Sequence, residues 1–110
     1  MPKPRALTET QFQQQVLDLA QLRGWSYYHT HDSQHAVAGF PDLVLVHVRQ
    51  KRIVFAELKK VGGKVSDAQR DWLANLRAAG AETAAWWPGD LEEIKAILAG
   101  KPITGPTLKG

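Results

Sequence analysis

The chain has 110 residues, a length that fits one domain able to bury a core without disulfides or bound metals. It contains no cysteine, which excludes disulfide scaffolds, cysteine-ligated zinc and a thiol nucleophile. It has no apolar run long enough for a membrane span and no apolar signal region, so we expect an intracellular, cytoplasmic protein. The net charge of +3 permits a polyanionic partner without requiring one.

The first half of the chain predicts one helix and three strands after a basic, proline-containing arm at residues 1–6. Thr8 and Gln11 have the spacing of a capping box, so a helix begins there, and Gly24 ends it. Aromatic and β-branched residues predict three strands, with a loop after the first strand and a short polar turn after the second. The strands span residues 25–31, 43–48 and 52–58, and the loop spans residues 32–40.

The second half predicts two helices around one strand. Ser66 and Gln69 form a second capping box, which opens a helix that ends at Gly80. A strand over residues 81–87 follows, and then a helix that Asp90 and Glu93 cap in the same way. The expected apolar face of the first of these helices consists of Ala68, Trp72, Leu76 and Ala79.

The predicted order is α-β-β-β-α-β-α, and it defines the expected fold class. It indicates an α/β protein with a mixed sheet of about four strands flanked by helices. We expect a single domain over residues 7–100, followed by a loose tail over residues 101–110 that lacks any periodic pattern.

Two acidic residues are predicted to face each other on the central hairpin. If Arg49 and Gln50 form a two-residue turn, Asp42 lies opposite Glu57 in the antiparallel ladder, and directly opposed Cβ atoms are about 4.5–5.5 Å apart. Two carboxylates this close repel each other, and a divalent cation with oxygen ligands removes the conflict. A three-residue turn would instead move Asp42 to the other face.

Lys59 lies on the same strand face as Glu57, two residues further along. Its ammonium group could hold a water nucleophile or stabilise the charge that develops during phosphoryl transfer beside a metal. The alternative is that Asp42, Glu57 and Lys59 form a solvated polar face with cross-strand salt bridges.

Two segments match a known family motif. Residues 39–43 (Gly-Phe-Pro-Asp-Leu) and 57–59 (Glu-Leu-Lys) resemble the PD-(D/E)xK nuclease motif, and more narrowly its VRR-NUC branch. In that branch a serine and a glutamine open the helix after the second motif, as Ser66 and Gln69 do here. An acidic residue on the first helix also belongs to the pattern, and Glu9 fits. The resemblance implies a restriction-endonuclease-like core.

The resemblance, which covers about residues 8–87, also implies a role for each matching residue. Asp42 and Glu57 would be metal ligands, with the main-chain carbonyl of Leu58 as a third. Lys59 would position or activate the attacking water.

Glu9 and Gln69 have roles implied by the resemblance and alternatives suggested by their positions. Glu9 would bind the metal through water or ligate a second ion, whereas an acid in a first helical turn also interacts favourably with the helix dipole. Gln69 would belong to the catalytic site, although the capping box with Ser66 gives it a structural alternative. We expect that one side chain cannot fully serve both purposes.

Basic and aromatic residues outside the motif have open assignments. Lys60 and Lys64 fit a mobile basic flap that contacts DNA phosphates, or a solvated loop. Gly62-Gly63-Lys64 lacks the other positions of a phosphate-binding loop and is not interpreted as one. We expect structural or DNA-facing roles for His29, His31 and His35. A zinc site is less favoured, because the sequence lacks cysteine and helical metal-binding motifs.

These observations lead us to expect a metal-dependent deoxyribonuclease with Mg²⁺, or Mn²⁺ in its place, as cofactor. We expect a homodimer that cuts branched DNA such as four-way junctions, because paired cuts require two sites and VRR-NUC proteins that stand alone look dimeric. The alternatives are a non-catalytic DNA-binding or scaffold protein that keeps the fold, and a nuclease acting on RNA. Interface candidates, all of which could instead be core, are Trp25, Tyr27, Tyr28, Trp86 and Trp87.

Overall fold

The computed structural model of the protein describes residues 7–30 and 37–104. The predicted arm at residues 1–6, the histidines His31 and His35, and residues 105–110 of the predicted tail lie outside these ranges.

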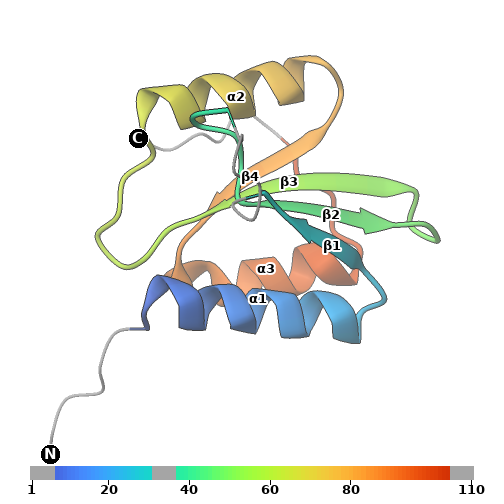
Figure 1. The fold of residues 1–110 in the computed structure, drawn as a ribbon. Helices are drawn as coiled ribbons and strands as arrows, with labels where there is room; N and C mark the ends of the chain where they lie inside the picture. The colour runs from blue at the N-terminus through green and yellow to red at the C-terminus, as the bar shows by residue number, and fades with distance from the viewer. Residues whose placement is uncertain (1–6, 31–36, 105–110) are drawn as a thin grey trace, which may run out of the picture.

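The described residues form a mixed four-stranded sheet with helices on both faces, in the predicted order α-β-β-β-α-β-α. The strands lie in the order β1-β2-β3-β4; the first three are antiparallel, and β4 runs parallel to β3. Helix α2 covers one face of the sheet, and α1 and α3 lie side by side on the other (Figure 1). The bounds are α1 Glu9–Leu22, β1 Ser26–His29, β2 Leu43–His47, β3 Arg52–Leu58, α2 Asp67–Ala78, β4 Glu82–Trp86, the 3-10 helix η2 Pro88–Asp90, and α3 Leu91–Ala99.

The main core lies between the sheet and the pair α1 and α3. Thr8 caps α1 through the predicted capping box with Gln11, which fixes the helix start. Alternate residues of each strand point to this side, as the period of two requires, and meet the apolar stripes of both helices. The fully buried members include Phe12, Val16, Leu43, Leu45, Val54, Ala56, Leu58, Ile94 and Leu98.

The apolar face predicted for α2 is only partly correct. Leu73 is its buried residue, whereas Ala68 and Ala79 are exposed and Trp72 and Leu76 are half-buried. The stripe facing the sheet begins at Gln69, four residues before Leu73, because the sheet beneath it carries the carboxylate of Glu57, to which Gln69 donates. Apolar spacing alone does not reveal an inward-facing glutamine.

Two further expectations near the C-terminus need correction. The side chain of Asp90 accepts a hydrogen bond from the Trp87 amide at 2.9 Å and so closes η2, and it makes no cap for α3. Residues 101–104 of the predicted loose tail are held against the sheet. The Ile103 amide donates to Glu82 at 2.9 Å, and the side chain of Ile103 packs against the core.

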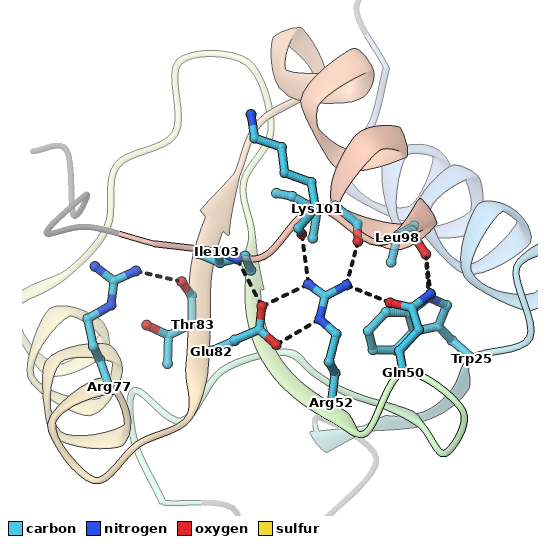
Figure 2. Close-up of polar contacts among 10 residues, drawn as sticks. Trp25, Gln50, Arg52, Arg77, Glu82, Thr83, Leu98, Lys101 and Ile103 are labelled. Atoms are coloured by element: carbon cyan, nitrogen blue, oxygen red, sulfur yellow. Dashed lines mark hydrogen bonds and ion pairs between the residues drawn. The ribbon is translucent and has the colours of Figure 1, made fainter.

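Arg52, at the start of β3, forms hydrogen bonds with several segments at this end of the molecule (Figure 2). Its guanidinium binds both carboxylate oxygens of Glu82 at 2.8 Å and donates to the carbonyls of Ile97 and Lys101 and to Gln50. It also lies 5.2 Å from the ring centre of Trp25. One planar side chain thus joins β3, β4, α3 and the segment that follows α3.

Candidate active site

The hairpin of β2 and β3 brings Asp42 and Glu57 together. The ladder runs from His47 opposite Arg52 to Leu43 opposite Ala56, and Asp42 and Glu57 form the next rung. This is the register that the sequence predicts. The paired strands end one rung before the expected turn, and residues 48–51 form a four-residue turn closed by a bond from the Lys51 amide to the Val48 carbonyl at 3.1 Å.

Each of the two acids is bound to the main chain of the opposite strand. The Asp42 amide donates to Oε1 of Glu57 at 3.2 Å, and the Leu58 amide donates to Oδ2 of Asp42 at 2.8 Å. These bonds hold both carboxylates in fixed positions at the point where β2 begins and β3 ends. They also place the main chain of Leu58, the predicted carbonyl ligand, directly beside the pair.

Glu57 has a strongly perturbed carboxyl group. Its side chain is 2% exposed, and burial together with the charge of Asp42 raises its pKa from 4.5 to about 8. Lys59 acts in the opposite direction, with Nζ 3.4 Å from Oε2 of Glu57. One ammonium group therefore does not compensate two adjacent carboxylates, and a carboxyl group held in this state is characteristic of functional sites.

Gln69 makes the capping box and also reaches the acid pair, although we expected from the sequence that one side chain could not fully serve both positions. Its Oε1 accepts from the Ser66 amide at 2.8 Å and completes the capping box. Its Nε2 makes a short hydrogen bond to Oε2 of Glu57. An amide carries an acceptor and a donor at opposite sides, so one glutamine can fix the start of α2 and orient the buried carboxylate.

Thr30, which the sequence does not single out, and Gly39, the first residue of the motif, hold the first motif in place. The Thr30 hydroxyl donates to the Pro41 carbonyl at 2.6 Å, and its amide donates to the Asp42 carbonyl at 3.0 Å. Gly39 has φ of +87°, and a Cβ there would lie 2.6 Å from the main chain of Ala68. The glycine of the motif therefore permits close approach of α2, while Thr30 offers no signal beyond its place after a strand.

Two hydrogen bonds attach the loop after β3 to the end of β4. The Lys59 amide donates to the Trp86 carbonyl at 2.8 Å, and the indole of Trp87 donates to the Gly63 carbonyl at 2.8 Å. Lys60 is exposed on this loop and Lys64 lies one residue beyond Gly63. The predicted basic segment is thus anchored to the end of β4, and Trp87, which the sequence left unassigned, provides the anchor.

The remaining candidates lie apart from the acid pair or have no defined role. Glu9 is exposed in the first turn of α1, which begins on the same side of the view as the loop after β3 (Figure 1). Across residues 7–30 and 37–104, no group of three or more histidine or acidic side chains could hold a metal ion, so Glu9 does not join Asp42 and Glu57 in such a group. His29 is half-buried, with its ring 5.5 Å from that of Tyr27.

The chemistry of the acid pair fits a hard divalent cation. Mg²⁺ is commonly held by one or two carboxylates, with waters and substrate phosphates completing the shell, so two acids without a third are sufficient. A cation would also remove the repulsion that raises the pKa of Glu57. The residues that could hold it are Asp42, Glu57 and the main chain of Leu58.

Comparison with known proteins assigns the family. The VRR-NUC domain model matches residues 4–86, more than half of the chain, and includes both strand motifs and the start of α2. The protein therefore belongs to the VRR-NUC family, whose domain is a PD-(D/E)xK-type nuclease and whose members typically use divalent metals. Neither the curated proteins nor the solved structures searched contain a match. Within the described ranges no helix is long and apolar enough to cross a membrane.

Proposed function

We propose that the protein is a metal-dependent endonuclease that hydrolyses phosphodiester bonds in DNA, with Mg²⁺, or Mn²⁺ in its place, as cofactor. The observation that carries this proposal is the acid pair of Asp42 and Glu57, which lies beside Lys59. Burial and the charge of Asp42 together raise the pKa of Glu57 to about 8. The family assignment supports the same reaction class.

Each side chain has a distinct task in the proposed reaction. Asp42, Glu57 and the Leu58 carbonyl would hold the metal, which when bound lowers the pKa of water and polarises the scissile phosphate. Lys59, with its side chain 16% exposed and its amine 3.4 Å from Glu57, would hold the attacking water by donating to it. Gln69 would keep Glu57 in the orientation that the metal requires.

DNA would approach over the loop after β3. Lys60 and Lys64 are both exposed on this loop, and Trp87 fixes the loop through Gly63, so both ammonium groups would be available to phosphates on either side of the cleaved bond. Glu9, on the first turn of α1, would act through a water or a second ion that enters with the DNA.

We further propose that the enzyme acts as a homodimer on branched DNA, because two cuts in step need two sites. The exposed fractions of the candidate residues limit which of them could form the interface. Trp25 and Trp86 are core residues, 4% and 3% exposed, and contribute nothing to an outer surface. Tyr27 and Tyr28 on the edge strand β1 remain exposed, and Trp87 is half-buried.

One assay tests activity and substrate together. Single-stranded, duplex, flap and four-way DNA, with RNA in parallel, are incubated with wild type or Lys59→Ala in Mg²⁺, Mn²⁺ or EDTA. We expect cleavage in both metals, none in EDTA, a strong loss in Lys59→Ala, and paired cuts in the four-way junction. Binding of DNA without cleavage in any metal would instead support the scaffold alternative.

Thermal melting and light scattering separate the remaining parts of the proposal. Mg²⁺ or Mn²⁺ is expected to raise the melting temperature of wild type, because a ligand that binds the folded state stabilises it, and to leave Asp42→Asn unchanged. Equal metal binding by both proteins would place the metal elsewhere. A monomeric mass at micromolar concentration, with single uncoupled nicks, would contradict the dimer and leave the nuclease assignment intact.

A further inference from the structure

An apolar patch lies exposed on the sheet face that carries the acid pair. Tyr28 is 57% exposed, Ile53 is 52% exposed and Val46 is 37% exposed, and Val48 extends the patch into the hairpin turn with 85% exposure. We call Tyr28, Val46 and Ile53 the open face. Exposed apolar residues that lie together on one surface are characteristic of binding sites, whereas single ones are ordinary.

Strand register places the open face next to the candidate site. Tyr28 pairs with Val44, and Val44 pairs with Phe55, so these three side chains project from the same face of the sheet. Asp42 precedes Val44 by two residues, which puts it on that face and diagonal to Tyr28. Diagonal neighbours in an antiparallel pair have Cα atoms about 7–8 Å apart, within reach of an aromatic ring.

Helix α2 covers only part of this face. It packs on β4 and on β3, where Trp72 meets Phe40 at 5.0 Å between ring centres and Phe40 meets Phe55 at 6.0 Å. The hairpin end of β2 and β3 projects beyond α2 (Figure 1). In the parts of the chain that the structure describes, Tyr28, Val46 and Ile53 thus remain outside the packed layer.

Cationic residues stand at both ends of the open face. Lys60 is exposed on the loop beside the acid pair, and Arg49 and Lys51 are exposed in the hairpin turn at the other end. An aromatic and apolar surface between positive charges is complementary to single-stranded nucleic acid, whose bases stack while its phosphates bind cations. A second copy of the chain would bring the same positive charges against each other.

We propose that the open face stacks an unpaired nucleobase of DNA next to the scissile phosphate, with Tyr28 as the stacking ring and Val46 and Ile53 as the apolar floor beside it. This rests on the proposed function, because it takes the acid pair as the cleavage site. It identifies the substrate as DNA with at least one unpaired nucleotide adjoining the cleaved bond, which flaps contain, which a four-way junction provides when a base pair at its crossover opens, and which continuous duplex lacks.

The test separates base stacking from phosphate binding. The parent protein carries Asp42→Asn, and two variants add Tyr28→Leu or Tyr28→Phe to it. Each protein is titrated with a single-stranded oligonucleotide that carries 2-aminopurine and with an abasic oligonucleotide of equal length. Leu22→Ala is the control, because Leu22 is 79% exposed at the end of α1, which lies on the opposite face of the sheet from the open face (Figure 1). Melting and light scattering accompany each variant.

We expect the parent and Tyr28→Phe to bind the base-bearing strand at least about 5-fold more tightly than the abasic strand, the lower limit of one base–aromatic stack. Tyr28→Leu is expected to lose this preference and keep its affinity for the abasic strand, and Leu22→Ala is expected to keep both. An unchanged preference for the base-bearing strand in Tyr28→Leu would overturn the inference, whether or not the mass of that variant changes.

Failure of the proposed function has a different signature. If Asp42→Asn cleaves as wild type does, the acid pair is not the cleavage site, whatever the binding assay shows. If cleavage depends on Asp42 but the three Tyr28 proteins bind alike, the nuclease assignment stands and the stacking proposal is wrong.

Discussion

Strand β3 has a charged cluster at each end, and the two clusters shift the pKa of their glutamates in opposite directions. At its start, Arg52 binds Glu82 on β4 with both oxygens at 2.8 Å (Figure 2). Burial alone raises the pKa of Glu82, but the hydrogen bonds from Arg52 and Ile103 and the charge of Arg52 lower it below 4.5. At its end, burial and the charge of Asp42 raise the pKa of Glu57 to about 8.

The difference comes from the partner that each carboxylate has. A guanidinium presents a fork of donors that matches both oxygens of Glu82, so charge and geometry are satisfied within the protein. Glu57 has another acid across the ladder, a neutral amide, and one ammonium at 3.4 Å. The first cluster stabilises the fold. In the second, the charged form of Glu57 lacks a sufficient partner within the protein, and a cation from outside could supply one.

The largest expected effect is loss of cleavage in Asp42→Asn or Glu57→Gln. Each variant removes a charge that the proposed metal needs, and we expect the rate to fall at least ~100-fold, the usual scale for removing one electrostatic group from a catalytic site. The amide that Asp42→Asn introduces keeps an oxygen to accept from the Leu58 amide, so the melting temperature of this variant in EDTA is expected to stay equal or rise. Glu92→Gln, on the exposed side of α3, is the control, and near-wild-type activity in either site variant would exclude this site.

At the other end of the strand, Arg52→Met is expected to destabilise the protein by about 3 kcal/mol. The substitution leaves Glu82 in a half-buried position without its charge partner and removes donors from the carbonyls of Ile97 and Lys101. Lys59→Met is the contrasting variant, with little loss of stability and a large loss of activity. Urea unfolding measures both, and equal destabilisation by the two substitutions would remove the distinction between the clusters.

Gly39→Ala tests how tightly the first motif is built against α2. A residue with a side chain is strained at φ of +87°, by about 1–3 kcal/mol, and its Cβ would also meet the Ala68 main chain at 2.6 Å. We expect lower stability and lower activity together, because α2 carries Gln69 to the site. Gly62→Ala is the control: its φ is +81°, but a Cβ there meets no atom within 4 Å. Equal effects of the two substitutions would show that backbone strain alone matters.

The same comparison shows what the sequence can and cannot predict. The hairpin register follows from turn length and the period of two, so the pairing of Asp42 with Glu57 could be predicted. The double use of Gln69 could not, because a local capping pattern carries no information about a strand that packs beneath the helix. The Arg52 cluster joins four segments distant in sequence, and nothing local in the sequence distinguishes Arg52 from the basic residues that are exposed.

The smallest expected effect is on the pH dependence of stability, measured by urea unfolding in EDTA. Glu57 has a pKa of about 8 in the folded protein and 4.5 as its ordinary value, so the folded state binds its proton more tightly. That contribution to stability is present at low pH and is lost as the pH rises from 4.5 through 8, with a slope of at most about 1.4 kcal/mol per pH unit.

Subtracting the profile of Glu57→Gln from that of wild type isolates the contribution of Glu57 from those of all other groups. Asp42→Asn is expected to shorten the pH range over which stability falls, without abolishing the fall, because burial, the larger cause of the raised pKa, remains. Glu82 has the opposite sign: its lowered pKa makes its contribution fully present above 4.5 and lost as the pH falls through the folded-state value. The difference in stability between wild type and Glu82→Gln should therefore be largest above pH 4.5 and shrink as the pH falls below it. If the wild-type and Glu57→Gln profiles are parallel from pH 4.5 to 8, the acid pair is already compensated in the metal-free protein, and the contrast between the two ends of β3 does not hold.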